Sequence, residues 1–273
     1  METIHKTVDD LIACVPDGAK LAVPSDYSGV AMSATLALIE RRHRNIHLVT
    51  VPTGGLQAEL LIGAGCIGRL ETAAITLGEF GPAPRFVASV KCGEMDLRDA
   101  TCPAIHAGLL AAEKGIPFAA LRGIIGSDLL RARRDWKVIE NPFSANDRIV
   151  VVPAIVPDFA LFHAPLADAD GNVWVGRRRE LMTMAHAARA TLVTVEEVRS
   201  RSLFKDEAWA AGTIPSLYVN AIAKVKCGAW PLALWGYYES DGDFMERYIG
   251  AAKTRQGFDD FLSSWPRQRI GVQ

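Results

Sequence analysis

Two glycine-rich stretches decide the fold of this sequence: LIGAGCIGRLETAAITLG at residues 61–78 and GIPFAALRGIIGSD at residues 115–128. In both, short apolar segments end in glycine. Glycine at such a point lets the backbone come close to a ligand or to another chain. We therefore treat residues 60–128 as the organising part of the chain and interpret the rest outward from it.

Strand-like and helix-like segments alternate through the first 121 residues. The expected strands are 21–23, 46–51, 70–77, 95–98 and 117–121, and the expected helices are 7–15, 30–42, 56–62, 84–91 and 103–114. This alternation predicts an α/β fold with an open, mostly parallel sheet flanked by helices. Ligands bind such sheets beyond the carboxyl ends of the strands. We expect the loops 24–29, 52–55, 78–82, 99–103 and 122–128 to share that edge.

The second half has a different pattern. Strands are expected at 149–155, 159–163, 173–175, 191–198 and 217–225, and helices at 179–189, 243–254 and 258–265. Asp168-Ala169-Asp170-Gly171-Asn172 predicts a hairpin-type turn. No low-complexity linker or internal repeat interrupts the chain. We expect residues 1–273 to form a single domain, with mixed strand extensions in its C-terminal half.

Composition excludes several classes of protein. A formal net charge of −1 over 273 residues argues against nucleic acid as a partner. Five cysteines without close pairs predict neither a disulfide framework nor a zinc site, and we expect no metal. The polar segment Met1–Lys6 argues against a signal peptide. Since no apolar run approaches the roughly 18 residues of a membrane span, we expect a cytoplasmic protein without membrane contact.

Two glycine motifs have opposite contexts. Gly63-x-Gly65-x-x-Gly68 has the spacing of a dinucleotide-binding motif, but an expected helix precedes it and a strand follows. The true motif needs the reverse order, so we interpret this one as a helix end with a tight turn. Thr53-Gly54-Gly55 follows a strand and opens a helix. Its backbone amides are suited to an anionic group, and a plain turn is an equal alternative.

Other candidate residues each have a structural alternative. The arginines 131, 133, 134 and 177–179 are suited to a polyphosphate such as coenzyme A, although charged runs are usually solvated faces. Cys102 lies in an expected edge loop at the start of a helix, where a thiolate is stabilised; a small buried thiol is the alternative. From the residues alone, the chain is an α/β protein with a ligand crevice and no visible catalytic constellation.

An ordered set of motifs resembles the alpha subunit of the glutaconate CoA-transferase type, in family I of the CoA-transferases. The matching pieces are Leu61–Thr72, Phe80–Pro84, Gly115–Phe118, Arg122-Gly123, Gly126–Leu129, Pro153-Ala154, Pro157-Asp158, Asp168–Asn172 and Cys227–Pro231. They occur in the family's order between about Asp17 and Trp265.

The resemblance implies an active site between this chain and a beta subunit, in a heterodimer or heterotetramer. In that family a glutamate, usually of the beta chain, attacks the acyl-CoA thioester, and CoA then passes to an acceptor carboxylic acid. Coenzyme A is thus substrate, and no tightly bound cofactor is expected. Arg122 is the best candidate to pair with a substrate carboxylate. Gly126, Ser127 and Asp128 would shape the same loop, and Gly54 and Gly55 would border the acyl site.

The sequence departs from the family pattern at two points. The loop after the first strand, Asp17–Asp26, lacks the paired glycines of many members, whose backbone amides are natural oxyanion donors. Cys102 stands where a glutamate often aligns, which is the carboxylate of a related branch of ring-opening CoA-dependent hydrolases. Two alternatives to transfer therefore stay open: hydrolysis of a CoA ester, and a non-catalytic chain that completes a partner's site.

Overall fold

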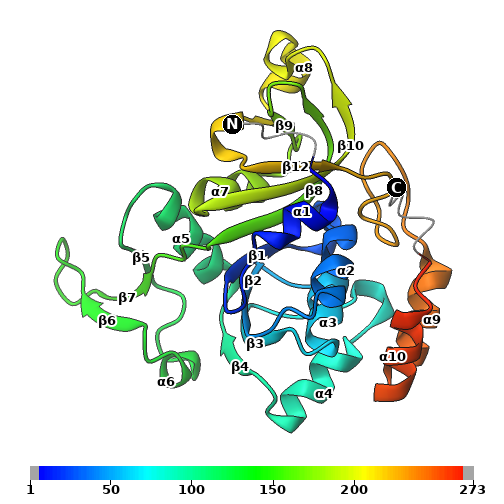
Figure 1. Cartoon of the computed structure of the whole chain (residues 1–273). Coiled ribbons are helices and arrows are strands. Elements are labelled where there is room, and N and C mark those ends of the chain that lie inside the picture. The colour runs from blue at the N-terminus through cyan, green and yellow to red at the C-terminus, as the bar shows by residue number, and fades with distance from the viewer. Residues whose placement is uncertain (1–5, 267–273) are drawn as a thin grey trace.

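Parallel strands from both halves of the chain form the central sheet. In this computed structural model, which describes residues 6–266, the order is β12–β10–β8–β1–β2–β3–β4, and every neighbouring pair is parallel. The strands are β1 (Lys20–Pro24), β2 (Ile46–Val51), β3 (Ile67–Thr72), β4 (Asp96–Asp99), β8 (Phe159–Asp168), β10 (Ala190–Arg199) and β12 (Ala221–Lys224). The expected α/β fold with a mostly parallel sheet is confirmed (Figure 1).

Helices cover both faces of this sheet. Successive side chains of a strand point to opposite faces, so that each face contributes to its own apolar core. In β1, Leu21 and Val23 face one core, whereas Ala22 faces the other. The first core packs against α1 (Val8–Ala13), α2 (Met32–Glu40), α3 (Leu56–Gly63), α4 (Pro84–Cys92), α9 (Gly242–Ala252) and α10 (Arg255–Ser263). The second packs against α5 (Cys102–Glu113) and α7 (Arg179–Ala187).

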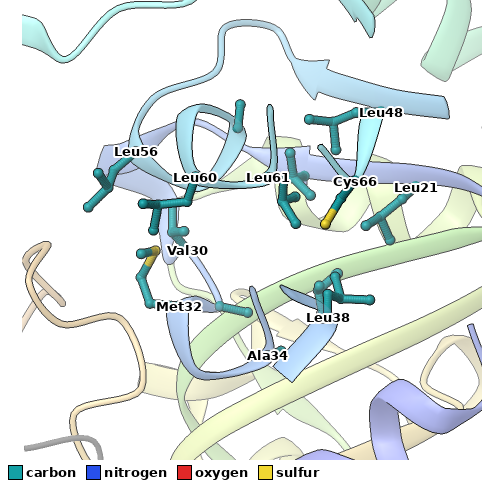
Figure 2. Packing of buried hydrophobic residues seen from close by; sticks show 14 of the residues in the cluster. Leu21, Val30, Met32, Ala34, Leu38, Leu48, Leu56, Leu60, Leu61 and Cys66 are labelled. Atoms are coloured by element: carbon teal, nitrogen blue, oxygen red, sulfur yellow. The ribbon is translucent and has the colours of Figure 1, made fainter. Parts of the chain in front are cut away.

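The interior between α2, α3 and the sheet is tightly filled. Leu56, Leu60 and Leu61 of α3 belong to the first core, and Figure 2 shows Leu60 and Leu61 pointing toward the side chains of α2. All three leucines are fully buried, and burial of each stabilises the fold by about 1.5–3 kcal/mol. This packing fixes the N-terminal end of α3 relative to the end of β1.

A second, smaller sheet lies to one side of the main sheet (Figure 1). It is antiparallel and contains β5 (Phe118–Leu121), β7 (Arg148–Pro153) and β6 (Lys137–Glu140). The short helix α6 (Leu129–Ala132) connects β5 and β6. Because β5 does not join the parallel sheet, our prediction that loop 122–128 follows one of its strands is wrong: Phe118 pairs with Pro153 instead.

The hairpin predicted at 168–172 is confirmed. Asp168 Oδ1 accepts hydrogen bonds from the backbone N–H groups of Asp170 (3.0 Å) and Asn172 (2.9 Å), and β9 (Val173–Trp174) returns antiparallel to β8. The strand β11 (Thr213–Ile214) extends this ribbon. The mixed extensions are therefore β9 and β11, beside the short helix α8 (Glu207–Ala210).

Some boundaries differ from expectation. The strand expected at 70–77 is β3, which begins at Ile67 and ends at Thr72, where the Thr72 hydroxyl accepts from Ala74 N–H in a local turn. Residues 216–218 form a short 3₁₀ turn before β12 rather than the start of a strand. Met1–His5, within the segment used to argue against a signal peptide, lie outside the described residues.

Candidate active-site cavity

A cavity of about 520 Å³ opens beyond the carboxyl ends of β1, β2 and β3. A segment near the C-terminus closes its far side. Its lining residues are Ser25, Asp26, Tyr27, Thr53, Gly54, Gly55, Thr76, Leu77, Gly78, Glu79, Phe80, Leu232, Ala233, Ser240 and Met245. Three of the edge loops predicted from the sequence, 24–29, 52–55 and 78–82, therefore do meet at one site.

Asp26 lies at the meeting point of these loops. It begins the 3₁₀ turn Asp26–Ser28 after β1, and both carboxylate oxygens lie 3.0 Å from the backbone nitrogen of Leu56, the first residue of α3. Burial raises the pKa of Asp26 to about 6, against the opposing effect of the Leu56 N–H. The chain thus places a half-buried carboxyl group at a helix N-terminus and beside the cavity.

Gly54 and Gly55, the two glycines before α3, have different structural roles. A Cβ atom at Gly55 would overlap the Asp26 carboxylate, so only glycine leaves room for that group. Gly54 N–H donates to Ala74 O (2.9 Å), and Thr76 N–H donates to Gly54 O (3.0 Å). These bonds clamp the loop after β2 to the loop after β3.

The turn that holds Asp26 packs closely against β8. Gly29 ends it with a φ of 79°, and a Cβ there would overlap the backbone oxygen of His163. His163 N–H donates to Gly29 O at 2.7 Å. The Ser28 hydroxyl donates to Glu180 at the start of α7. The position of Asp26 is therefore set by three elements that are distant in the sequence.

A buried polar cluster supports the far wall of the cavity. Glu196 accepts hydrogen bonds from His163 Nε2 (2.9 Å), Tyr238 Oη (2.8 Å) and Cys227 N–H (2.8 Å). Although burial opposes its ionisation, the bonds from His163 and Tyr238 leave its pKa below the ordinary value. This cluster anchors the segment 227–238, which includes the lining residues 232–233. Sequence reasoning missed it because its members come from β8, β10 and the segment after β12, which are distant in the sequence.

The other predicted site residues lie outside the cavity lining. Arg122 is exposed at the end of β5 and forms an ion pair with Asp147. Ser127 Oγ donates to Ile124 O at 2.8 Å, and exposed Asp128 pairs with Arg131 at 3.1 Å. Gly126, with a φ of 84°, completes this loop. Among the predicted site residues, only Gly54 and Gly55 line the cavity.

Cys102 is exposed at the first residue of α5, just beyond the end of β4. Thr101 caps that helix by accepting a hydrogen bond from Ala104 N–H at 3.3 Å. The alternative interpretation of Cys102 as a buried thiol is therefore wrong.

Two arginines of the predicted polyphosphate-binding runs make contacts within the protein. Arg133 is buried, and its Nη2 lies 2.7 Å from Glu71 Oε1 and 2.9 Å from Asp135 Oδ2. The Arg178 guanidinium lies 3.2 Å from the centroid of the Trp235 ring. These contacts give both arginines a structural role.

Neither a metal centre nor a membrane span is evident in the described part of the chain. Residues 6–266 contain no group of three or more His, Cys, Asp or Glu side chains placed to hold a metal ion. No helix among these residues is long and apolar enough to cross a bilayer.

Comparison with known proteins gives a consistent family. The sequence profile of the family described as Coenzyme A transferase matches residues 5–225. One subunit of the 3-oxoadipate CoA-transferase from Pseudomonas knackmussii is 29% identical over 260 residues, or 93% of this chain and 89% of that protein. The IpdA subunit of a cholesterol ring-cleaving hydrolase from Mycobacterium tuberculosis is 26% identical over 269 residues, covering 94% of this chain and 91% of the relative.

Solved structures agree with this assignment. Glutaconate coenzyme A-transferase from Acidaminococcus fermentans superposes with a TM-score of 0.87 at 25% identity, over 96% of this chain and 88% of that one. A variant of the decarboxylase AibA/AibB gives a TM-score of 0.84 at 29% identity, over 97% of this chain and 98% of the other. The profile match, the full-length relatives and the shared fold together place this chain in the coenzyme A transferase family, as a chain of the alpha-subunit type.

Proposed function

We propose that this chain is the alpha subunit of an enzyme that moves CoA between an acyl-CoA and a small carboxylic acid. The observation that carries the proposal is full-length similarity to a CoA-transferase subunit, together with a cavity at the loop edge of the parallel sheet. A beta subunit is the expected partner and completes the site, in a heterodimer or heterotetramer.

The nucleophile in this proposal is a glutamate of the beta subunit. Its carboxylate attacks the thioester carbonyl, CoA leaves as thiolate, and an acyl-glutamyl anhydride forms. The thiolate then attacks the glutamyl carbonyl, which releases the first acid and leaves a glutamyl-CoA thioester. The acceptor acid repeats the two steps in reverse, so that CoA leaves on the new acid.

This chain contributes binding and positioning. Gly54 and Gly55 border the acyl group and keep the α3 N-terminus close to it. Arg122 lies outside the lining but is exposed, with a cation available to a substrate carboxylate when its ion pair with Asp147 opens. Gly126, Ser127 and Asp128 shape the loop that carries it, and Cys102 borders the CoA path at the start of α5.

Hydrolysis of a CoA ester is the second candidate, and similarity to the IpdA hydrolase chain is the observation that favours it. The exposed cysteine at position 102 stands where the resemblance predicts the carboxylate of that branch, which counts against it. In the third alternative, this chain is not catalytic and only completes a partner's site. A partner without a suitable glutamate would favour this alternative over CoA transfer.

The decisive assay uses the chain co-purified with its natural partner. Acyl-CoA is supplied with and without added carboxylic acids, and CoA esters, free CoA and CO₂ are measured. We expect acyl-CoA to be consumed only with an acceptor, with formation of the acceptor's CoA ester. Free CoA without an acceptor would support hydrolysis, and release of CO₂ would support decarboxylation, the activity named for AibA/AibB. Either result would overturn transfer.

A further inference from the structure

The described lining of the cavity carries negative charge and contains no balancing cation. Its lining includes two carboxyl groups, Asp26 and Glu79, and no lysine, arginine or histidine. Within residues 6–266, no cationic side chain forms an ion pair with Asp26. The remaining lining is hydroxylic, as at Thr53 and Ser240, or apolar, as at Leu77. Any anion that enters meets negative charge that no cation of this chain's described lining compensates.

The Asp26 carboxylate also occupies the N-terminus of α3, which would otherwise attract an anion. The N-terminus of α3 is a natural anion site because its N–H groups and its dipole point outward. The Asp26 carboxylate already fills this position, with both oxygens 3.0 Å from Leu56 N. Gly55 provides the space in which the carboxylate sits. A second carboxylate is thus repelled by Asp26 and gains nothing from the helix.

Cations lie next to the cavity but not in it. A neighbouring groove of about 410 Å³ shares Phe80 with the cavity and is lined by Arg85, Lys91 and Lys253. Two adjoining hollows therefore differ in charge. An acyl group in the first is separated from the cations of the second.

We propose that Asp26 makes this cavity selective for acyl groups without a second carboxylate, that is, for the acyl chains of small monocarboxylic acids. The inference rests on the proposed function and deepens it by naming the substrate class. Both 3-oxoadipate and glutaconate, for which two similar proteins are named, are dicarboxylates. The substrate of this chain would then differ from those two acids by lacking the second carboxylate.

The size of the effect follows from Coulomb's law. Two like charges about 5 Å apart in a partly buried site repel strongly enough to change an affinity roughly a hundredfold. Because Asp26 is only half-buried, solvent screening reduces this value. We expect discrimination of at least about tenfold. The pKa of about 6 keeps Asp26 largely ionised at pH 7.5, so the selectivity is present under ordinary assay conditions.

The test uses the assembled alpha–beta complex at pH 7.5 and acceptor pairs of equal carbon number: butyrate against succinate, and pentanoate against glutarate. For the wild type, kcat/KM for the monocarboxylate should exceed that for the dicarboxylate at least about tenfold. Asp26→Asn should narrow this ratio about tenfold, mainly through a lower KM for the dicarboxylate. A wild-type preference for succinate, or an unchanged ratio in the variant, would overturn the proposal.

Two further variants control for folding and position. Asp17→Asn also replaces a carboxylate that accepts from a backbone N–H, that of Arg44 at 2.8 Å, but it precedes β1 at the opposite edge of the sheet, so the ratio should not change. Glu79→Gln, at an exposed lining position, should narrow the ratio less than Asp26→Asn does. If it and Asp26→Asn both have no effect, the cavity does not select by charge.

Failure of the proposed function is distinguishable from failure of this inference. If no acid yields a CoA ester, transfer fails. The charge preference is then measured as equilibrium binding of butyrate and succinate to the same complex by isothermal titration calorimetry. Tighter binding of butyrate, reduced in Asp26→Asn, would uphold the inference, and tighter binding of succinate would overturn it.

Discussion

Two carboxyl groups sit at two helix N-termini in this protein, and their surroundings differ. Asp26 accepts from Leu56 N–H at the start of α3, is half-buried and borders a cavity. Glu59 accepts from the N–H groups of Arg85 (2.7 Å) and Phe86 (2.8 Å) in the first turn of α4 and is fully buried. Burial raises the pKa of both carboxyl groups.

The two carboxylates differ in the partners of their remaining hydrogen-bond acceptor positions. Tyr248 Oη donates to Glu59 Oε1 at 3.1 Å, so protein atoms close that site on every side. Burial and the neighbouring carboxylate raise the pKa of Tyr248, which therefore stays protonated and remains a donor. Asp26 lines the cavity instead and is open to it. A carboxylate at a helix N-terminus thus contributes stability where it is fully buried, as at Glu59, and is available to a ligand where it borders a cavity, as at Asp26.

The largest expected effect is at the sealed site. Glu59→Ala leaves two backbone N–H groups and the Tyr248 hydroxyl buried without an acceptor, and should lower the free energy of unfolding by about 3–5 kcal/mol. Urea denaturation measures this. Tyr248→Phe removes only one of the three donors and should cost about 1 kcal/mol. Equal losses in the two variants would show that Glu59 does not hold α4.

The next effect is at the glycine that makes room for Asp26. Gly55→Ala places a Cβ against the carboxylate and should destabilise the protein by about 1–3 kcal/mol. Adding Asp26→Ala should recover part of the loss in a double-mutant cycle. Gly250→Ala in α9 is the control, because its Cβ meets nothing within 4 Å and alanine favours a helix. Additive effects at 55 and 26 would contradict the contact.

Substitution at Arg122 extends the comparison to an ion pair on the surface. If the guanidinium binds a substrate carboxylate, Arg122→Ala should reduce kcat/KM about tenfold or more without changing the melting temperature. Asp147→Ala separates the roles, since it breaks the same ion pair but leaves the cation in place. Equal losses of activity in both variants would mean that the pair only shapes the loop.

A smaller effect is expected in the pH dependence of stability, through the titration of Asp26. The folded pKa of Asp26 is about 6, above its ordinary value of 3.8, so the folded state binds this proton more tightly than the unfolded state. Asp26 therefore costs stability above pH 6, and the cost disappears as the pH falls toward 4. Relative to wild type, Asp26→Asn should be more stable at pH 7.5 than at pH 4.5, by about 1 kcal/mol. A pH-independent difference would mean that Asp26 titrates normally.

The smallest effect is expected at a third helix N-terminus, where the side chain is exposed. Cys102→Ser should change both turnover and stability little, within about 0.5 kcal/mol. The matched control is Cys66→Ser, which buries a hydroxyl in the first core and should destabilise by about 1–3 kcal/mol. A large loss of turnover in Cys102→Ser alone would give the exposed thiol a role in the reaction.

The site could be predicted from the sequence only in part. Gly54 and Gly55 are identifiable because they follow a strand and open a helix, a signal contained in adjacent residues. Asp26 stands out in the sequence only as a departure from the family pattern. Its contact with Gly55, which leaves room for the carboxylate, joins two loops that are distant in the sequence, so no local run of residues indicates it.

The sequence by itself determined the alternation of strands and helices, the bounds of β2 and the turn at 168–172. These features are encoded by apolar periodicity and by turn residues within a few positions of one another. The family followed from the resemblance of an ordered set of motifs along the chain. Only the tertiary structure decided that β5 leaves the main sheet and that Asp26 meets the N-terminus of α3. Both depend on which distant strands pair, and pairing is chosen by the packing of the whole chain rather than by any local run of residues.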